Sequence, residues 1–212
     1  MALGDGEALA ALLHGRDAVT CGPGLGVTDD TRALVAALVR RCRAPLVLDA
    51  DGLNVVAGTR LLAERPAPTV VTPHPGEMAR LAGIDTAAVQ ADRLGVARRV
   101  AAEHGVVVVL KGAHTVIADP DGRAAIAPVG NPGLASGGTG DVLAGVIGGL
   151  LAQGLAAYDA AVFGVFAHGT AADMVAAERG EAGLLAHDVL AALPPAIARL
   201  QAAARERPRA GA

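Results

Sequence analysis

The 212-residue chain is almost devoid of aromatic side chains, since Trp is absent and Tyr158, Phe163 and Phe166 are the whole set. So few rings cannot form a platform on which nucleic-acid bases stack. The formal net charge is −3, so an excess of positive charge for binding nucleic acid or a membrane surface is also missing. We therefore expect neither nucleic acid nor membrane as a partner.

Cysteine is scarce as well: Cys21 and Cys42 are too few for a disulfide scaffold or a cysteine metal site. The first residues carry Asp5 and Glu7 and lack the basic segment of a secretory signal. The longest apolar run, 142–152, is too short to cross a bilayer about 30 Å thick. These absences favour a cytoplasmic protein.

Hydrophobic residues, in contrast, are abundant. They make up 52% of the chain and charged residues only 18%, which excludes intrinsic disorder because there is ample apolar surface to bury. The length fits one domain over residues 1–212, and no linker or internal repeat divides it. We expect residues 207–212 to fray.

Short β-branched runs alternate with longer helical patterns in the first half. The helical pattern 28–43 begins at a capping Thr28, and another runs from Asp85 or Thr86 to Gly105. The apolar runs are nearly continuous, as in strands covered on both faces. This alternation predicts an α/β fold with a mostly parallel sheet and helices on both faces. The four predicted strands are 17–21, 45–50, 69–72 and 106–111.

The second half has a different pattern of predicted secondary structure. A hairpin is predicted around the turn 119–122, between strands 115–118 and 124–128. A glycine-rich loop, 130–140, comes next. Helices are then predicted at 141–153, 157–178 and about 187–206.

Lys111 is the only lysine among 18 basic residues. It ends a predicted strand directly before Gly112, and the carboxyl ends of strands line the ligand crevice in open α/β sheets. Because arginine supplies every other basic side chain, a surface charge alone does not explain the one lysine, and we expect Lys111 to contact a ligand. The alternative is a lysine that snorkels from a strand end.

The segment 131–141, NPGLASGGTGD, runs into an apolar helix. Gly137, Gly138 and Gly140 allow backbone N–H groups to converge on an anion at the positive end of that helix. Asp141 then lies in the first helical turn, where it could receive a proton beside a bound phosphate. The alternative is an ordinary N-cap aspartate after a flexible loop.

Three further strand ends carry candidate residues. The turn 22–26, GPGLG, fits a close approach to a ligand and a tight structural turn about equally well. His74, in the segment 72–77, lies at the crevice rim, although a lone histidine is more often a capping or packing residue. Asp49 and Asp51 fit a magnesium-linked role or the capping of the next helix. The other histidines without a partner pattern are taken as structural: His14, His104, His168 and His187.

Several catalytic motifs are absent from the sequence. It contains no Gly-Lys pair of a Walker A loop, no HExxH, no CxxC and no GxSxG. Ser136 is the only serine, so a serine hydrolase would need its nucleophile inside the glycine-rich loop.

Five ordered segments together resemble the ADP/ATP-dependent NAD(P)H-hydrate dehydratases, a branch of the ribokinase-like superfamily. The resemblance runs from about residue 17 to residue 190. The matching segments are GPGLG (22–26), LDADGLN (48–54), TPHPGE (72–77), LKGAHT (110–115) and NPGLASGGTGDVLAG (131–145).

This resemblance implies a parallel α/β fold and a repair activity. The family transfers phosphate from ADP or ATP to the hydroxyl of a hydrated nicotinamide ring, and the phosphate then leaves to regenerate NADH or NADPH. It implies that Asp141 is the general base and that Gly24 or Gly26, His74 and Asp141 contact the hydrated dinucleotide. It also implies Mg²⁺ held largely by phosphates and water, and a symmetric homo-oligomer such as a tetramer. The implied nucleotide contacts are Lys111, Gly112, Ala113, His114, Thr115, Gly138 and Gly140.

The sequence departs from the family at its start. Members begin with a glycine-rich strand–turn–helix and a further αβ unit before the strand that matches 17–21, whereas this chain starts with a predicted helix at 6–14. We therefore expect an exposed edge strand and apolar helix faces. Two alternatives stay open: a kinase acting on a hydroxymethyl or hydroxyethyl heterocycle, and a non-catalytic nucleotide-binding fragment.

Overall fold

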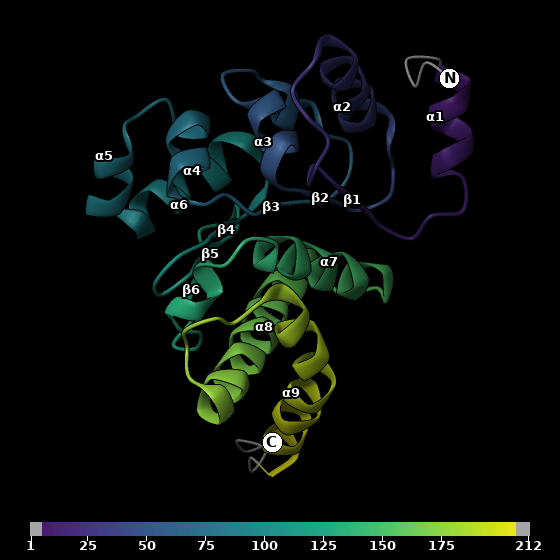
Figure 1. Cartoon of the computed structure of the whole chain (residues 1–212). Coiled ribbons are helices and arrows are strands. Elements are labelled where there is room, and N and C mark those ends of the chain that lie inside the picture. Colours follow the sequence, from purple (N-terminus) through teal and green to yellow (C-terminus); the bar gives the residue numbers. More distant parts are fainter. Residues whose placement is uncertain (1–5, 207–212) are drawn as a thin grey trace, which may run out of the picture.

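A computed structural model describes residues 6–206 and contains one six-stranded sheet (Figure 1). The strands follow one another across the sheet in chain order, and neighbours from β1 to β4 run parallel. The last two strands form an antiparallel hairpin at the edge. The mostly parallel α/β fold predicted from the sequence is therefore confirmed. The strands are β1 (Val19–Cys21), β2 (Leu46–Leu48), β3 (Thr69–Val71), β4 (Val107–Leu110), β5 (Val116–Ala118) and β6 (Ala124–Ile126).

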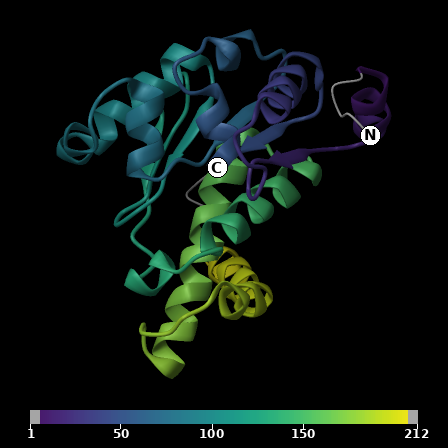
Figure 2. The same cartoon turned by 45° about the horizontal axis from the view of Figure 1, so that its top comes forward.

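Helices cover both faces of the sheet (Figures 1 and 2). Above the sheet in Figure 1 lie α2 (Asp29–Arg41), α3 (Ala50–Val56), α4 (Pro75–Ala82), α5 (Thr86–Ala91) and α6 (Arg93–His104). Below it lie α7 (Thr139–Ala152), α8 (Ala157–Arg179) and α9 (Ala186–Glu206). The first helix, α1 (Gly6–Leu13), stands beside the β1 edge, and two short 3₁₀ turns occupy Leu61–Glu64 and Pro132–Ala135.

Separate hydrophobic clusters fill the two faces. Leu48, Val71 and Val108 point to one side and pack with residues of α2, α3, α4 and α6. Val47 and Val70, one residue earlier on their strands, point to the other side, where α7 and α8 pack. A strand buried on both faces needs apolar residues at every position, which explains the continuous runs in the sequence.

Two helix predictions were wrong in detail. The predicted helix 85–105 is two helices, because Asp92 leaves the helical conformation and its carboxylate accepts a hydrogen bond from the Gly95 N–H at 2.8 Å. The helix after the glycine-rich loop starts at Thr139 rather than Asp141, so Gly140 belongs to its first turn. Gly105 ends α6 in the left-handed conformation, as predicted.

The long helix α8 is apolar enough to pass for a membrane span by length and composition. However, 56% of its most apolar stretch is buried inside the protein. It contacts β3, β4 and β5 on one side and α7 and α9 on others. Its apolarity is accounted for by this central packing position.

Candidate active site

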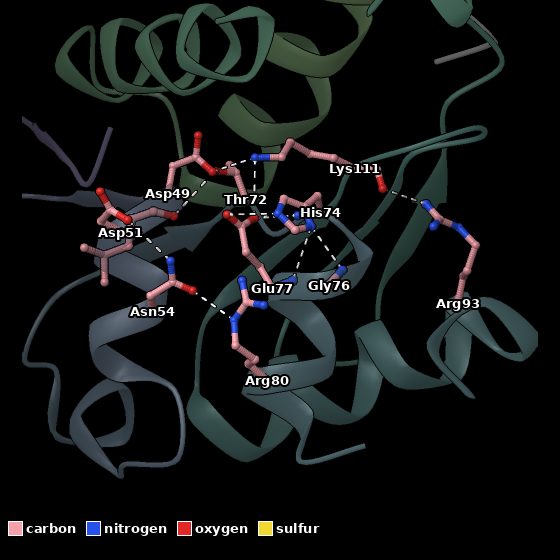
Figure 3. Close-up of polar contacts among 11 residues, drawn as sticks. Asp49, Asp51, Asn54, Thr72, His74, Gly76, Glu77, Arg80, Arg93 and Lys111 are labelled. Atoms are coloured by element: carbon pink, nitrogen blue, oxygen red, sulfur yellow. Dashed lines mark hydrogen bonds and ion pairs between the residues drawn. The ribbon is translucent and has the colours of Figure 1, made fainter. Parts of the chain in front are cut away.

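Three neighbouring parallel strands end at the same edge of the sheet. Asp49 follows β2, the loop 72–74 follows β3, and Lys111 follows β4. The backbone ties these ends together, since the Lys111 N–H donates to the Pro73 carbonyl at 2.8 Å and the Thr72 N–H to the Leu48 carbonyl at 3.1 Å. Residues more than sixty positions apart in the chain thereby meet (Figure 3).

The Lys111 amine turns inward onto two carboxylates (Figure 3). Its Nζ donates to Asp49 Oδ1 at 2.6 Å and lies 3.8 Å from Glu77 Oε2. The side chains of Asp49 and Glu77 are 2% and 6% exposed, and that of Lys111 is 20% exposed. We call these three residues the charge cluster. The snorkelling interpretation of Lys111 was wrong, because buried carboxylates need a counter-charge and Lys111 supplies it.

Asp49 also fails to cap the next helix. It occupies the N-cap position of α3, yet its side chain makes no capping hydrogen bond. Asp51 accepts a hydrogen bond from the Gly26 N–H at 2.8 Å and one from Asn54 at 3.4 Å. The capping alternative was therefore wrong for Asp49, whose carboxylate pairs with Lys111.

His74 caps α4, as the structural interpretation of this residue predicted. Its Nδ1 accepts hydrogen bonds from the Gly76 N–H at 3.0 Å and the Glu77 N–H at 3.3 Å. The Glu77 carboxylate returns the contact by accepting the His74 N–H at 2.8 Å, which completes a capping box. The side chain stays 52% exposed. Its contact with a substrate remains a prediction.

The three glycines of the turn 22–26 differ in what they require. A Cβ at Gly22 would overlap the Asp49 carbonyl oxygen, so this position needs glycine for close backbone approach. Gly24 and Gly26 also have positive φ, but a Cβ there would meet nothing within 4 Å. The structural interpretation therefore holds for Gly22, while the space around Gly24 and Gly26 is open.

The start of α7 presents unpaired backbone donors. Gly138 occupies the N-cap position at φ +86° and offers no side chain for capping. Within residues 6–206, the N–H groups of Gly137, Gly138, Gly140 and Asp141 donate no hydrogen bond. Asp141 is exposed in the first turn. Donors of this kind at a helix N-terminus bind anions readily.

Gly140 brings these donors against the charge cluster. A Cβ built on it would lie 3.4 Å from Lys111 Nζ and 3.7 Å from Asp49 Oδ2. The ammonium and the positive end of α7 therefore face the same small region. The structure thus brings together the lysine and the glycine-rich loop that the sequence singled out separately.

The segment 111–115 leaves β4 through strained backbone. Gly112 has φ +130° and His114, which carries a side chain, has φ +52°. Arg93 of α6 holds this exit by donating to the Leu110 carbonyl at 3.0 Å. It also donates to the Lys111 carbonyl at 3.2 Å (Figure 3). Ala113 and His114 remain exposed, while the Thr115 hydroxyl donates to the Gly112 carbonyl at 3.0 Å. Sequence reasoning missed Arg93, because nothing separates it from the many surface arginines.

Helix α8 holds the glycine-rich loop from behind. The Asp173 carboxylate accepts the Gly130 N–H and the Asn131 side-chain amide, each at 2.9 Å. His168 Nε2 donates to the Thr139 carbonyl at 2.9 Å. Burial and, to a smaller extent, the charge of Lys111 lower the pKa of His168 while the hydrogen bond to Thr139 raises it, and the net result is a pKa of about 4. His168 is structural, as predicted, but Asp173 was missed because its partners lie about forty residues away.

A mostly parallel α/β sheet with a candidate site at the ends of β2, β3 and β4, closed by the start of α7, defines a ribokinase-like protein. A solved ribokinase-like superfamily protein of Enterococcus faecalis is 25% identical, and its TM-score of 0.74 supports this class. Residues 4–195 match the family described as NAD(P)H-hydrate dehydratase, and the chain belongs to this family.

Individual relatives agree with this assignment. The bifunctional NAD(P)H-hydrate repair enzyme of Thermofilum pendens is 46% identical over 95% of this chain, which spans 38% of that protein. The ADP-dependent (S)-NAD(P)H-hydrate dehydratase of Xanthomonas campestris is 42% identical over 92% of this chain and 66% of its own length. A Bacillus subtilis ADP/ATP-dependent NAD(P)H-hydrate dehydratase, co-crystallised with ATP/Mg²⁺, has 34% identity and a TM-score of 0.80 over 91% of this chain and 70% of that one.

Proposed function

We propose that this chain carries out the ADP- or ATP-dependent dehydration of hydrated NADH and NADPH. The observation that carries the proposal is a single arrangement: the Lys111 ammonium lies against Gly140 and the unpaired N–H groups at the start of α7, and Asp141 is the next residue in the first turn of that helix. The ammonium and the N–H groups suit a polyphosphate, and the carboxylate suits a proton.

The chemistry requires an activated leaving group. The hydroxyl on the hydrated ring leaves poorly, so Asp141 accepts its proton while the oxygen attacks the terminal phosphoryl group of the nucleotide. The bond from that phosphorus to the bridging oxygen breaks, which leaves the nucleotide one phosphate shorter. Phosphate then departs from the ring with its C–O bonding electrons, and loss of a ring proton restores the double bond. Lys111 and the N–H groups of α7 stabilise the charge on the phosphoryl oxygens.

The candidate site divides into two sides under this proposal. The positive φ of His114 supports a nucleotide side at the exit from β4, because strained backbone often accompanies ligand sites. This nucleotide side comprises Lys111, Gly112, Ala113, His114, Thr115, Gly138 and Gly140. The dinucleotide side comprises Gly24, Gly26, His74 and Asp141. The open space above Gly24 and Gly26 supports this second assignment.

We infer that Mg²⁺ accompanies the nucleotide and neutralises phosphate charge. The donor set of the chain fits a metal carried by phosphates and water rather than by a protein cage. Within residues 6–206, no three His, Cys, Asp or Glu side chains gather to hold a metal ion. Asp49 and Glu77, the buried carboxylates of the charge cluster, face the Lys111 ammonium.

The test uses hydrated NADH, Mg²⁺ and ADP or ATP, and follows recovery of the nicotinamide absorbance. We expect recovery with the parent chain and a loss of about 10²- to 10⁴-fold in turnover for Asp141→Asn, the usual contribution of a positioned base. Calorimetry with ADP should show nearly unchanged affinity, because the variant keeps the backbone donors. Unchanged turnover in the variant would refute the role of Asp141.

A stable phosphorylated alcohol as product would instead identify a small-molecule kinase. ADP binding without turnover of any substrate would identify a nucleotide-binding fragment.

We further infer a cytoplasmic location and a homo-oligomer. Light scattering of the purified protein measures the mass of the oligomer.

A further inference from the structure

The charge cluster contains more negative than positive charge. Two carboxylates that are 2% and 6% exposed face one ammonium. Taking a carboxylate out of water is unfavourable unless it is paired and hydrogen-bonded. The cluster therefore fixes the ammonium, because any movement of Nζ away from Asp49 leaves a buried charge without its partner.

Each member of the cluster is itself held in place. Glu77 is held by the His74 N–H, which donates to its Oε2 at 2.8 Å. The backbone of Lys111 is held on one side by Pro73 and on the other by Arg93. Asp49 follows β2, and its N–H donates to the Cys21 carbonyl at 3.1 Å. The position of Nζ is thus determined by three strand ends and α6.

The ammonium keeps donors to spare. An ammonium has three N–H groups, and within the described residues only Asp49 accepts a hydrogen bond from it. The amine is partly exposed and lies against Gly140 at the start of α7. A compact ammonium suits this place better than a planar guanidinium, since one donor can anchor to a carboxylate while the others face a ligand.

We propose that Asp49 is a positioning residue: together with Glu77 it holds the Lys111 ammonium at a fixed point beside Gly140, ready to meet the phosphoryl group that is transferred. This inference rests on the proposed function. Asp49 acts only through Lys111 and touches neither substrate nor nucleotide. The position of the amine is therefore set before the nucleotide binds, and the reaction requires no reorganisation there.

A double-mutant cycle tests this role. Asp49→Asn keeps the shape and one acceptor but removes the charge that fixes Nζ. We expect the turnover number to fall about 10- to 100-fold, the size of effect that small misplacements of reacting groups produce. The affinity for ADP should change little, because the lysine is still present and one carboxylate fewer repels the phosphates. In the Lys111→Gln background, Asp49→Asn should have no further effect on turnover.

The matched control is Asp119→Asn. Asp119 is also 2% exposed and paired with a basic residue, Arg123. It follows β5, whose antiparallel pairing with β4 places it at the opposite edge of the sheet from Lys111. Turnover should be unchanged in this variant. An equal loss of turnover in both variants would overturn the inference.

Two outcomes of the cycle would also overturn it. An Asp49→Asn effect of the same size with and without Lys111 would mean that Asp49 acts on its own. A shift in the Mg²⁺ concentration needed for half-maximal rate would mean that Asp49 binds the metal. Circular dichroism of all variants checks that they are folded before rates are compared.

A second measurement does not depend on turnover. Because Lys111 is the only lysine in the sequence, ¹⁵N-lysine labelling of a chain with no added lysine yields one side-chain ammonium signal. We expect that signal to be visible in the parent, to shift on addition of ADP, and to broaden beyond detection in Asp49→Asn. If the parent shows these signals but no turnover, the proposed reaction fails while the positioning of Lys111 stands. If the signal is absent from the parent or unaffected by Asp49→Asn, the inference fails.

Discussion

The two halves of the candidate site are built in opposite ways. In the charge cluster, the carboxylates of Asp49 and Glu77 are buried and face the ammonium of Lys111, which is 20% exposed. In the glycine-rich loop, four backbone N–H groups have no partner within residues 6–206. The carboxylates of the charge cluster are thus paired within the protein, whereas the N–H groups at the start of α7 remain free for a ligand.

The difference shows where rigidity comes from in each half. The sheet determines the position of the charge cluster, because neighbouring strands fix the spacing of the residues that follow them. The glycine-rich loop and the start of α7 are held by α8, through Asp173 and His168. Variants can therefore damage one half while sparing the other.

The largest effect on stability is expected at Gly22, where the turn 22–26 packs against the backbone of Asp49 in the charge cluster. Gly22→Ala would force a Cβ into the Asp49 carbonyl oxygen at a φ that side chains rarely adopt. We expect the free energy of unfolding to fall by at least about 4 kcal/mol, the range of exceptional single substitutions. Urea unfolding followed by circular dichroism measures it.

Gly24→Ala is the matched control for this variant. Its φ is also positive, but a Cβ there would meet nothing within 4 Å, so we expect a loss of only about 1–2 kcal/mol. Equal losses in the two variants would show that the contact between Gly22 and Asp49 does not hold the charge cluster in place.

The next effect concerns the glycine-rich loop and its dependence on pH. His168 has a pKa of about 4 when folded, against an ordinary value of 6.5. Well above pH 6.5 the residue is neutral in both states and its stabilising contact is intact. Between pH 6.5 and 4 only the unfolded chain takes up the proton, so stability falls as the pH drops, by roughly 3 kcal/mol in total.

His168→Gln isolates this contribution, because an amide can still donate to the Thr139 carbonyl but does not titrate. Other groups titrate equally in both proteins, so the difference between their urea-unfolding free energies at pH 7 and pH 4 reports on His168 alone. Parallel pH profiles in the two proteins would contradict the assignment.

The sequence predicted the charge cluster and the loop to different extents. Strand ends are visible from apolar runs, and the rarity of lysine singled out Lys111, so the edge of the sheet was located correctly. The pairing of Lys111 with Asp49 was not predictable, because it joins residues 62 positions apart and depends on strand order. The split at Asp92 was missed because a local side-chain hydrogen bond outweighed a continuous helical pattern.

A smaller effect, on the affinity for ADP, is expected at Gly140, where the start of α7 meets the charge cluster. In Gly140→Ala the added methyl would make ordinary contacts with the Lys111 amine, so the variant should fold. It would cover the face of the amine that a phosphate needs, and the loss of one or two charge-assisted hydrogen bonds predicts about 10- to 100-fold weaker ADP binding. Gly145→Ala, on the same helix with open space around it, gains the same helix propensity and should bind ADP normally. Calorimetry with both variants decides whether ADP binds at the contact between Gly140 and Lys111 or depends on α7 as a whole.

The smallest effect tests whether α8 supports the loop from a distance. Asp173→Ala removes the acceptor for the Gly130 N–H and the Asn131 amide, and we expect a loss of about 1–2 kcal/mol in stability with three- to tenfold weaker ADP binding, roughly one hydrogen bond's worth.

Asp188 provides the comparison for Asp173, because it likewise accepts one backbone N–H, that of Leu185, and one side-chain donor, that of Arg179, but holds the start of α9 instead. Asp188→Ala should cost similar stability and leave ADP affinity unchanged. If both variants weaken ADP binding equally, the effect is a general loss of stability. If only Asp173→Ala does, the free N–H groups of α7 owe their arrangement to a carboxylate that never touches the ligand.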